Sequence, residues 1–453
     1  MKHNLKIALA QLNPLVGDVI RNVDKLIKIR SELDDEVDII VAPELYISGY
    51  PIDDLVLRDD FLILVEKQIE KLAKVTKDNK SAIIIGAPRK DNKFIKNSVF
   101  VLEDGKILTL RDKYELPNTG VFDEQRIFEP GSLSGPANIK GVKIGLPICE
   151  DIWEENVLEC LAESGAEIIL AINASPYTMT KKDERFTVSV ARVHETKLPL
   201  IYLNRIGGQD ELIFDGSSFG LNANGNLFFS LLDFQEQVSI IDFFYKNNKW
   251  IGKGHIQKTS SKIEGLYKAL VLGLRDYVKN NEFPGVLLGM SGGIDSALVA
   301  AIATDALGPK LVQAVMLPSP FTSNTSLNDA KTTVDLLGIK YSILKINDGM
   351  KIIETILNGF DGPKFLPGIT EENIQSRLRG LMLMALSNRF GQMVLATGNK
   401  SEYAVGYATL YGDMCGGYAP IKDVWKTDVF ELCKWRNNNF SNGFLGPNRK
   451  VMS

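Results

Sequence analysis

The stretch GVLLGMSGGIDSALVAA at residues 285–301 constrains the fold of this chain more than any other. An apolar run leads into a tight Ser291-Gly292-Gly293 turn, and the apolar spacing from Ala297 onward is that of a helix. A strand that passes through a glycine turn into a helix is typical of open α/β sheets, whose ligands bind beyond the carboxyl ends of the strands. The sequence therefore predicts a parallel sheet with a ligand-binding loop at 289–296.

This loop lacks the lysine of an ordinary ATP-binding loop. Neither GxxxxGK[ST] nor GxGxxG fits, and no lysine lies between Lys279 and Lys310. Glycines let the backbone approach an anion closely, and a helix N-terminus offers free N–H donors. Asp295 would repel a bare phosphate but suits one that is bridged by Mg²⁺. The loop is predicted to hold a pyrophosphate with its metal through backbone groups; the alternative is a glycine turn that serves only packing.

Length and composition narrow the class of protein. A chain of 453 residues is too long for one typical core, so two domains are expected. The net charge of −4 gives no basic surface for nucleic acid, and no apolar run approaches the roughly 18 residues of a membrane span. The N-terminus is unlike a secretory signal, and the four cysteines form no CxxC pair. We therefore expect a cytoplasmic enzyme with neither a nucleic-acid nor a membrane partner.

The first 245 residues alternate short apolar runs with helical patterns. A helix is predicted near 20–33, and hairpins are predicted at Asp104-Gly105 and Asn224-Gly225. Buried strands are predicted at 5–12, 38–45, 81–88, 142–149, 166–174 and 198–204. Buried strands, hairpins and amphipathic helices together predict sheets that pack on each other and are covered by helices.

A polar segment, residues 246–262, separates this region from the rest and is predicted to be a linker. Beyond it, apolar runs at 285–289, 311–318, 340–346 and 392–397 alternate with helical stretches. This alternation predicts a doubly wound parallel sheet within residues 263–453.

The loop SGGIDS resembles the pyrophosphate-binding loop of the ATP pyrophosphatase superfamily, whose members split ATP between its α and β phosphates to adenylate a substrate. Four further segments resemble the NAD synthetases in particular: ITEENIQSRLRG (369–380), ATGNKSE (396–402), GYATLYGDM (406–414) and PIKDVWKTDVFEL (420–432). The resemblance covers residues 263–435. It implies adenylation of the nicotinate carboxylate of deamido-NAD, followed by attack of ammonia to give the amide.

The same resemblance assigns ligands to residues of the second domain. It implies that Asp295 and Glu402 flank Mg²⁺ and that Asn373 and Glu402 contact deamido-NAD. Lys400 and Lys426 could stabilise negative charge on the leaving pyrophosphate. The alternatives are a solvated lysine for Lys426 and a surface acid for Glu402. The implied ATP-binding set is Gly289, Met290, Ser291, Gly292, Gly293, Ile294, Asp295, Ser296 and Thr397.

A second constellation lies in the first domain. Cys149, in LPICEDIW, is predicted at the end of a buried strand, and the other three cysteines are interpreted as small buried hydrophobes. Glu44 in PELYISGYP and Lys113 in RDKYELPN also lie at predicted strand ends. A carboxylate base, an ammonium that stabilises an oxyanion and a thiol nucleophile would then converge at one end of a sheet.

This set resembles the nitrilase superfamily, whose members hydrolyse amides and nitriles with a Glu-Lys-Cys triad. NASPY (173–177) and GGQDELIFDG (207–216) resemble the glutaminase part of glutamine-dependent NAD synthetases. The resemblance implies that Glu44 is the base, that Lys113 stabilises the oxyanion and that Cys149 forms a glutamyl thioester. Ser175 and Lys181 would hold the L-glutamine or serve structure alone. Asp123-Glu124 would support the triad or form an exposed acidic turn.

Two features depart from the pattern of the family. The family usually reads LPNYG where this chain has LPNTG, so Thr119 replaces a tyrosine that is expected near the glutamine. Weaker glutamine binding, or greater dependence on other contacts, could follow. The chain stops at PNRKVMS, whereas family members continue with a segment that supplies a further lysine to deamido-NAD, so that contact is not assigned.

The sequence thus predicts an α/β protein with an N-terminal αββα nitrilase-like sandwich (1–245) and a C-terminal doubly wound ATP pyrophosphatase domain (263–453). The expected reaction amidates deamido-NAD with ammonia from glutamine and converts ATP to AMP and pyrophosphate, with Mg²⁺ as cofactor. The alternatives are an amidotransferase acting on another carboxylate, a nucleotide sensor without catalysis, and a nitrilase with an accessory domain. A homo-oligomer is expected, because the synthetase domains of the family pair as dimers.

Overall fold

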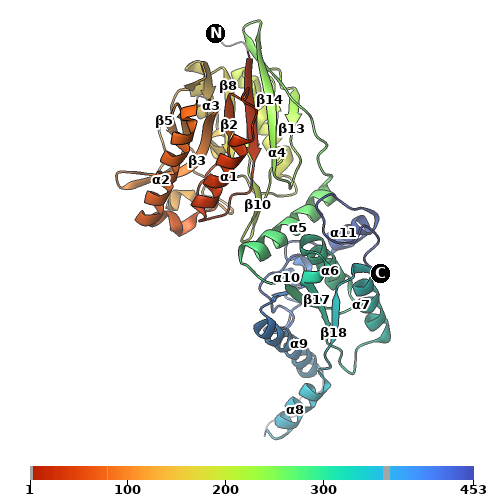
Figure 1. The fold of residues 1–453 in the computed structure, drawn as a ribbon. Coiled ribbons are helices and arrows are strands. Elements are labelled where there is room, and N and C mark those ends of the chain that lie inside the picture. Colours follow the sequence, from red (N-terminus) through yellow and green to blue (C-terminus); the bar gives the residue numbers. More distant parts are fainter. Residues whose placement is uncertain (1–3, 79, 361–367) are drawn as a thin grey trace. The chain divides into compact units, whose positions relative to one another are not determined.

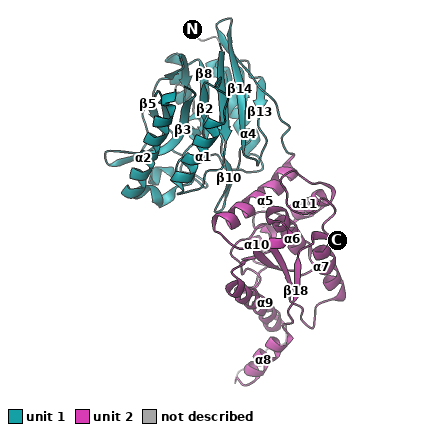
Figure 2. Cartoon of the chain, viewed as in Figure 1, with its two compact units in different colours: residues 1–260 teal, residues 261–453 magenta. Residues whose placement is uncertain are grey.

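The structure is a computed structural model that describes residues 4–78, 80–360 and 368–453. The chain divides into two compact units, Met1–Ser260 and Ser261–Ser453 (Figure 2). Each unit has its own sheets and its own hydrophobic core. Among the described residues, no helix is both long enough and apolar enough to cross a membrane.

In its described residues, the first unit has a seven-stranded and a six-stranded mixed sheet (Figure 1). The larger sheet has the order β15-β14-β1-β2-β3-β4-β5, and β1, β2 and β3 are mutually parallel. Its strands are β1 (Asn4–Gln11), β2 (Ile39–Val41), β3 (Ala82–Asp91), β4 (Phe94–Glu103), β5 (Lys106–Asp112), β14 (Gln237–Lys246) and β15 (Lys249–Lys253).

The smaller sheet has the order β13-β12-β9-β8-β7-β6, with β7, β8 and β9 parallel. Its strands are β6 (Ala137–Ile139), β7 (Val142–Gly145), β8 (Ile168–Asn173), β9 (Leu200–Asn204), β12 (Phe219–Leu221) and β13 (Leu227–Ser230). A separate ribbon pairs β10 (Ile206–Gln209) with β11 (Leu212–Asp215). The helices are α1 (Val19–Ser31), α2 (Asp59–Val75), α3 (Glu155–Glu163) and α4 (Lys181–Thr196), with short 3₁₀ turns η1 (Asp53–Leu57), η2 (Thr76–Asp78), η3 (Glu124–Arg126) and η4 (Cys149–Ile152).

Strand periodicity explains how these layers stack. In β1, Leu5, Ile7 and Leu9 belong to the core that the two sheets share, whereas Ala8 and Ala10 belong to the core beneath α1 and α2. Successive side chains of a strand point to opposite faces, so each sheet has one face for the other sheet and one for helices. The second sheet alternates in the same way between the shared core and α3 and α4. The first unit is therefore the predicted αββα sandwich.

The prediction of a linker over 246–262 is wrong for its first part. β14 enters this segment, and β15 pairs with it antiparallel. Asn247 and Asn248 both have positive φ, 53° and 60°, which suits the tight turn of a two-residue hairpin. Trp250 of β15 is buried in the shared core, while its neighbours face solvent. The polar composition of the segment therefore reflects the outer face of an edge strand.

In its described residues, the second unit has one parallel four-stranded sheet with the order β18-β17-β16-β19. Its strands are β16 (Val286–Gly289), β17 (Val312–Met316), β18 (Lys340–Ile343) and β19 (Met393–Leu395). The other elements are α5 (Lys262–Asn280), α6 (Ile294–Leu307), η5 (Pro309–Leu311), α7 (Asn324–Leu337), α8 (Asn347–Asn358), α9 (Ile369–Phe390), α10 (Lys400–Val405) and α11 (Lys426–Asn438).

Helices cover both faces of this sheet. Val286 and Leu288 of β16 pack into one core with α5, α6, α7 and α11, whereas Leu287 packs into a second core with α9. The unit is therefore doubly wound, as predicted, and β16 leads through residues 290–293 into α6. This arrangement places the glycine loop at the carboxyl end of β16, where open α/β sheets bind ligands.

Candidate active sites

The predicted triad of the first unit comes from three separate elements. Glu44 lies shortly after β2, Lys113 directly follows β5, and Cys149 begins η4. Ile148, the residue before Cys149, forms an isolated parallel β-bridge with Ile172 of β8. The two sheets thus bring these side chains together between them, with exposures of 1%, 1% and 2% for Glu44, Lys113 and Cys149.

The Glu44 carboxylate is held by three donors. Its Oε1 accepts from Lys113 Nζ and from Asn97 Nδ2, both at 2.8 Å, and its Oε2 accepts from the backbone N–H of Ala174, also at 2.8 Å. Asn97 lies in β4, and its carbonyl also accepts from the backbone N–H of Lys113 at 2.8 Å. These contacts fix both oxygens of Glu44. Sequence analysis did not single out Asn97, although a buried asparagine in an apolar strand is a signal that could have found it.

Lys113 lies between two carboxylates. Its Nζ donates to Glu124 Oε1 at 2.9 Å and Oε2 at 2.8 Å as well as to Glu44, and the hydroxyl of Tyr50 donates to Glu124 Oε1 at 3.0 Å. Burial alone would lower the pKa of Lys113, but the charges of Glu124 and Glu44 outweigh it and raise this pKa well above its ordinary value. Lys113 is therefore an ammonium at neutral pH. Of the predicted acidic pair, Glu124 is buried and contacts Lys113, whereas Asp123 is exposed and pairs with Arg126.

Cys149 has a strained backbone and a buried thiol. Its φ is +49°, a conformation that non-glycine residues adopt mainly where the surrounding structure imposes it. Asp151 holds the turn that contains Cys149, because its carboxylate accepts from the N–H of Ile148 at 2.9 Å and from those of Tyr114 and Glu115 at 3.0 and 2.8 Å. Burial, followed by the charge of Glu44, raises the pKa of Cys149 well above its ordinary value. The thiol is therefore protonated at neutral pH.

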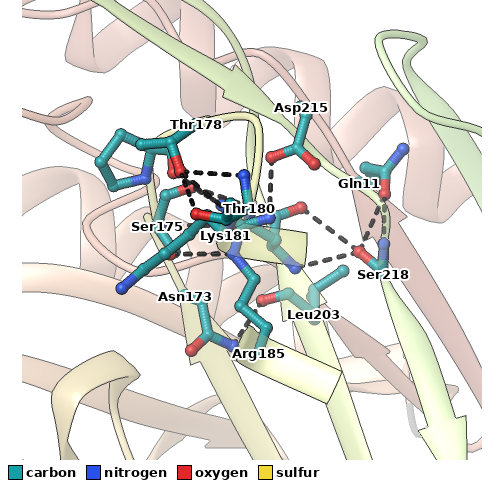
Figure 3. A network of polar contacts seen from close by, with 12 residues as sticks. Gln11, Asn173, Ser175, Thr178, Thr180, Lys181, Arg185, Leu203, Asp215 and Ser218 are labelled. Carbon is teal, nitrogen blue, oxygen red and sulfur yellow. Dashed lines mark hydrogen bonds and ion pairs between the residues drawn. The ribbon is translucent and has the colours of Figure 1, made fainter. Parts of the chain in front are cut away.

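The three residues with predicted glutamine contacts differ in position. Ser175, labelled in Figure 3, is buried. It directly follows Ala174, whose N–H donates to Glu44. Lys181 begins α4, and its Nζ lies 3.9 Å from the centre of the Trp153 ring. Thr119 is exposed on the loop between β5 and η3, and its carbonyl accepts from Phe122. The structure thus brings Ser175 to the triad and gives Thr119 no such contact.

In the second unit, the serines of the glycine loop fix its shape. Ser291 Oγ and Ser296 Oγ lie 3.1 Å apart, and the N–H of Gly293 donates to Ser291 Oγ at 3.1 Å. Ser296 Oγ donates to the carbonyl of Gly293 at 3.0 Å. Gly292 has a φ of +82°, and a Cβ there would lie 2.3 Å from the carbonyl oxygen of Ser326 at the start of α7. Only glycine fits this close approach of two backbones.

Gly292→Ala should therefore raise the KM for ATP by roughly 5- to 150-fold, the range that about 1–3 kcal/mol of strain represents. The matched control is Gly338→Ala, because Gly338 also has a positive φ, +71°, but faces open space. Steady-state NAD synthesis with saturating ammonia and varied ATP measures both variants. Equal effects of the two substitutions on this KM would contradict the importance of the contact between the loop and α7.

Asn399 joins the two carboxylates that were predicted to hold metal. Its Nδ2 donates to Asp295 Oδ1 at 3.0 Å, and its backbone N–H donates to Glu402 Oε2 at 3.0 Å. Asn399 also caps α10, because its Oδ1 accepts from the backbone N–H of Glu402 at 3.1 Å. The ammonium of Lys426, at the start of α11, contacts Asp295 Oδ2. Lys426 therefore pairs with the glycine loop, while its side chain stays 38% exposed.

A hollow of about 250 Å³ lies beside the loop. It is lined by the predicted residues Gly289, Met290, Ser291 and Thr397, together with Arg379 and other residues of α9. Sequence analysis did not single out Arg379, which donates from Nε to the carbonyl of Leu317 at 3.1 Å.

The two remaining predicted residues are engaged elsewhere. Asn373 Oδ1 accepts from the hydroxyl of Thr409 at 3.1 Å, which ties α9 to the segment after α10. Lys400 Nζ lies 4.7 Å from the centre of the Trp425 ring. The ligand contacts of both residues stay predictions.

Comparisons with known proteins assign a family to each of the two units. The family model for carbon-nitrogen hydrolase matches residues 6–244, and that for NAD synthase matches residues 266–443. The glutamine-dependent NAD(+) synthetase of Rhodobacter capsulatus is 45% identical over 96% of this chain and 79% of its own length. That of Thermotoga maritima is 40% identical over 96% of this chain and 81% of its own length.

Solved structures agree as well. A glutamine-dependent NAD+ synthetase from Acinetobacter baumannii, in complex with ADP, is 39% identical with a TM-score of 0.91, covering 99% of this chain and 84% of that one. One from Cytophaga hutchinsonii shares the fold, with a TM-score of 0.83 at 24% identity over 96% of this chain and 82% of that one. The chain therefore belongs to the glutamine-dependent NAD(+) synthetases, with a nitrilase-type glutaminase domain followed by an NAD synthase domain.

Proposed function

We propose that Glu44, Lys113 and Cys149 hydrolyse glutamine in this chain and that residues 289–296 bind ATP for the amidation of deamido-NAD. One observation supports the first part above all. The ammonium of Lys113 lies 2.8 Å from Glu44 in a site closed to solvent, and both charges act on the Cys149 thiol. A base, a cation and a nucleophile in one buried site are what acyl transfer from an amide needs.

The protonation states suggest the order of steps. Cys149 holds its proton at rest, so Glu44 takes that proton as Sγ attacks the side-chain amide carbon of glutamine. The Lys113 ammonium stabilises the oxyanion that forms. Glu44 then passes the proton to the departing nitrogen, which leaves as ammonia. Glu44 then takes a proton from water, whose oxygen attacks the thioester carbon. The Cys149 sulfur leaves as glutamate is released, and Glu44 returns the proton to it.

For glutamine binding we propose Ser175, Lys181 and Thr119. The contact of Ala174 with Glu44 supports Ser175, because it places the neighbouring residue beside the base. The charge of Lys181 acts on Glu150, the residue after Cys149, which supports a position near the nucleophile. For Thr119 the only support is the family pattern, in which the residue at this position is expected near the glutamine.

In the second unit we propose that residues 289–296 and Thr397 bind ATP and that Asn373 and Glu402 contact deamido-NAD. The hollow beside the loop supports the first assignment, as does the ADP complex of the Acinetobacter baumannii relative. Lys400 and Lys426 would stabilise the leaving pyrophosphate. The contact of Lys426 with Asp295 supports its place near the phosphates.

The proposed site for Mg²⁺ is Asp295 with Glu402. Mg²⁺ takes oxygen ligands, commonly one or two carboxylates together with substrate phosphates. Asn399 contacts both carboxylates, and the Lys426 ammonium beside Asp295 Oδ2 supports a position suited to a cation. Among the described residues, no group of three or more His, Cys, Asp or Glu side chains is arranged to hold a metal ion, so substrate oxygens and water would complete the ligand set. When bound, Mg²⁺ would neutralise charge on the leaving pyrophosphate.

The overall reaction is tested by incubating the protein with deamido-NAD, ATP, Mg²⁺ and glutamine and identifying the products by mass. NAD, AMP, pyrophosphate and glutamate are expected in equal amounts. ATP cleavage without NAD, or amidation of a different carboxylate substrate only, would contradict the proposal.

Asp295→Asn is expected to lower NAD synthesis by roughly 10²-fold or more with either glutamine or ammonia, because the metal that would bridge to the pyrophosphate loses a charged ligand. The matched control is Asp335→Asn, which removes another Asp–Lys pair, that with Lys331 on the surface of α7. Initial rates across a Mg²⁺ titration measure both variants. Wild-type turnover of Asp295→Asn with saturating ammonia would contradict the metal role.

We also propose a cytoplasmic homodimer. Support for an interface comes from α8 and α9, where large apolar side chains are exposed: Ile352 at 61%, Ile356 at 68%, Ile369 at 78% and Leu381 at 62%. Exposed apolar clusters of this kind commonly mark protein interfaces. Sedimentation equilibrium should give twice the chain mass, and Ile356→Glu should shift it toward the monomer.

A further inference from the structure

Arg185 is a buried cation that sequence analysis did not single out. It lies in the second turn of α4 with an exposure of 2% (Figure 3). Its Nε donates to Ser175 Oγ at 3.0 Å, and its Nη2 donates to the carbonyls of Ser175 and Pro176 at 2.7 and 2.8 Å. Its Nη1 donates to Asp215 Oδ1 at 2.7 Å. One guanidinium therefore clamps the segment between β8 and α4 and is itself oriented by a carboxylate.

The clamped segment also contacts the proposed base. Ala174 donates its N–H to Glu44, and the next residue, Ser175, donates its own N–H to Asn204 Oδ1 at 2.9 Å. The side chain of Asn204 returns a hydrogen bond from Nδ2 to the carbonyl of Ser175 at 3.1 Å. Arg185 and Asn204 thus hold the two sides of one short segment, which supplies one of the three hydrogen bonds that fix the Glu44 carboxylate.

The contact with Arg185 also sets the direction of the Ser175 hydroxyl. A guanidinium has only donors, so Ser175 Oγ must accept from Arg185 Nε. The single proton of the hydroxyl is then left for an acceptor on another group, and the hydroxyl of the buried Tyr202 lies near enough to compete for it when no substrate is bound. A bound glutamine presents such acceptors, namely its amide oxygen and its carboxylate.

We propose that Arg185 is a positioning residue for glutamine, which acts by turning the Ser175 O–H toward an acceptor oxygen of the substrate and by fixing the segment that holds Glu44. This rests on the proposed glutamine contact of Ser175. A lysine could not replace Arg185, because one ammonium is a point charge and cannot reproduce a planar fork that contacts Asp215, two carbonyls and a hydroxyl together. Asp215 then keeps the guanidinium in this orientation through its ion pair with Arg185.

The test is steady-state NAD synthesis with varied glutamine, run in parallel with saturating ammonia. Arg185→Lys should raise the KM for glutamine about tenfold. The ammonia-dependent rate should stay within a factor of two of wild type, which also shows that the protein is folded. Arg192→Lys is the matched control, because Arg192 lies on the same helix, is also buried and pairs with Glu195. Its KM for glutamine should be that of wild type.

A double-mutant cycle separates positioning from a general structural role. If Arg185 acts through Ser175, the effect of Arg185→Lys on the glutamine KM should shrink to less than threefold in a Ser175→Ala background. Equal effects in both backgrounds would overturn the inference while leaving the glutamine contact of Ser175 intact. A wild-type KM for Ser175→Ala alone would overturn that contact and the inference with it.

A second variant covers the case in which Arg185→Lys fails to fold. Asp215→Asn keeps an acceptor for Arg185 Nη1 but removes the charge that orients the fork. It should raise the glutamine KM in the same direction by a smaller factor, again with the ammonia-dependent rate preserved. An unchanged KM in Asp215→Asn would count against the proposal.

Discussion

Cys149→Ala is expected to lower glutamine-dependent NAD synthesis by roughly 10⁴–10⁶-fold, the loss typical of removing a catalytic nucleophile. Without the thiol no thioester can form, so glutamine releases no ammonia. The NAD synthase domain has its own loop and its own hydrophobic core, and its reaction needs only an activated carboxylate and ammonia from any source. Ammonium salts at high concentration should therefore still support synthesis in this variant. Parallel assays with the two nitrogen sources measure the difference.

Cys160→Ala is the matched control, because Cys160 is a free, partly buried cysteine of α3 in the same domain. It should behave like wild type with both nitrogen sources. Loss of both activities in a folded Cys149→Ala protein would mean that Cys149 serves structure or the synthase site. Loss of neither would mean that the first domain is not the source of ammonia.

The sequence predicts most of the fold because the strands follow simple periodicities. β16 was predicted at 285–289 and spans Val286–Gly289, and the hairpins at Asp104-Gly105 and Asn224-Gly225 join β4 to β5 and β12 to β13. The strand ends were less predictable. Cys149 was expected to end a strand, but β7 stops at Gly145 and the cysteine begins a 3₁₀ turn.

The contacts around the triad could not be read from the sequence, because they join residues far apart in the chain. Asn97 and Ala174 both donate to Glu44, yet no local pattern links either of them to PELYISGYP. For Glu124 the sequence allows two interpretations, support of the triad or an exposed turn, because an acidic pair in a loop is usually exposed. Only the fold shows that this side chain contacts Lys113. Whether such a side chain is buried depends on the tertiary structure, and composition alone does not reveal it.

The edge strand β15 could not be recognised from the polar composition of the segment that contains it. Its polar side chains indicated a linker, because a strand at the edge of a sheet presents one face to solvent and is often rich in lysine. The signal of a strand was present only in Trp250, which packs into the shared core and alternates with solvent-facing neighbours.

Glu44→Gln is expected to lower glutamine hydrolysis by roughly 10²–10⁴-fold, the usual contribution of a general base. Glutamine at this position keeps the shape of the side chain but cannot take the proton that Cys149 holds at rest. The amide also has only one acceptor oxygen, so it cannot satisfy Lys113 and the Ala174 N–H together as the carboxylate does. Glutamate release, measured with ammonia-dependent NAD synthesis as the check on folding, gives the size of the effect.

The matched control for this variant is Glu36→Gln, which removes a Glu–Lys pair on the surface of the same domain, that with Lys6. Exposed ion pairs contribute little to stability, so this variant should keep wild-type glutaminase activity. Full glutaminase activity in Glu44→Gln would exclude Glu44 as the base. The proton of the thiol would then have to pass to another acceptor, and Glu150 is the next candidate, because its negative charge also acts on Cys149.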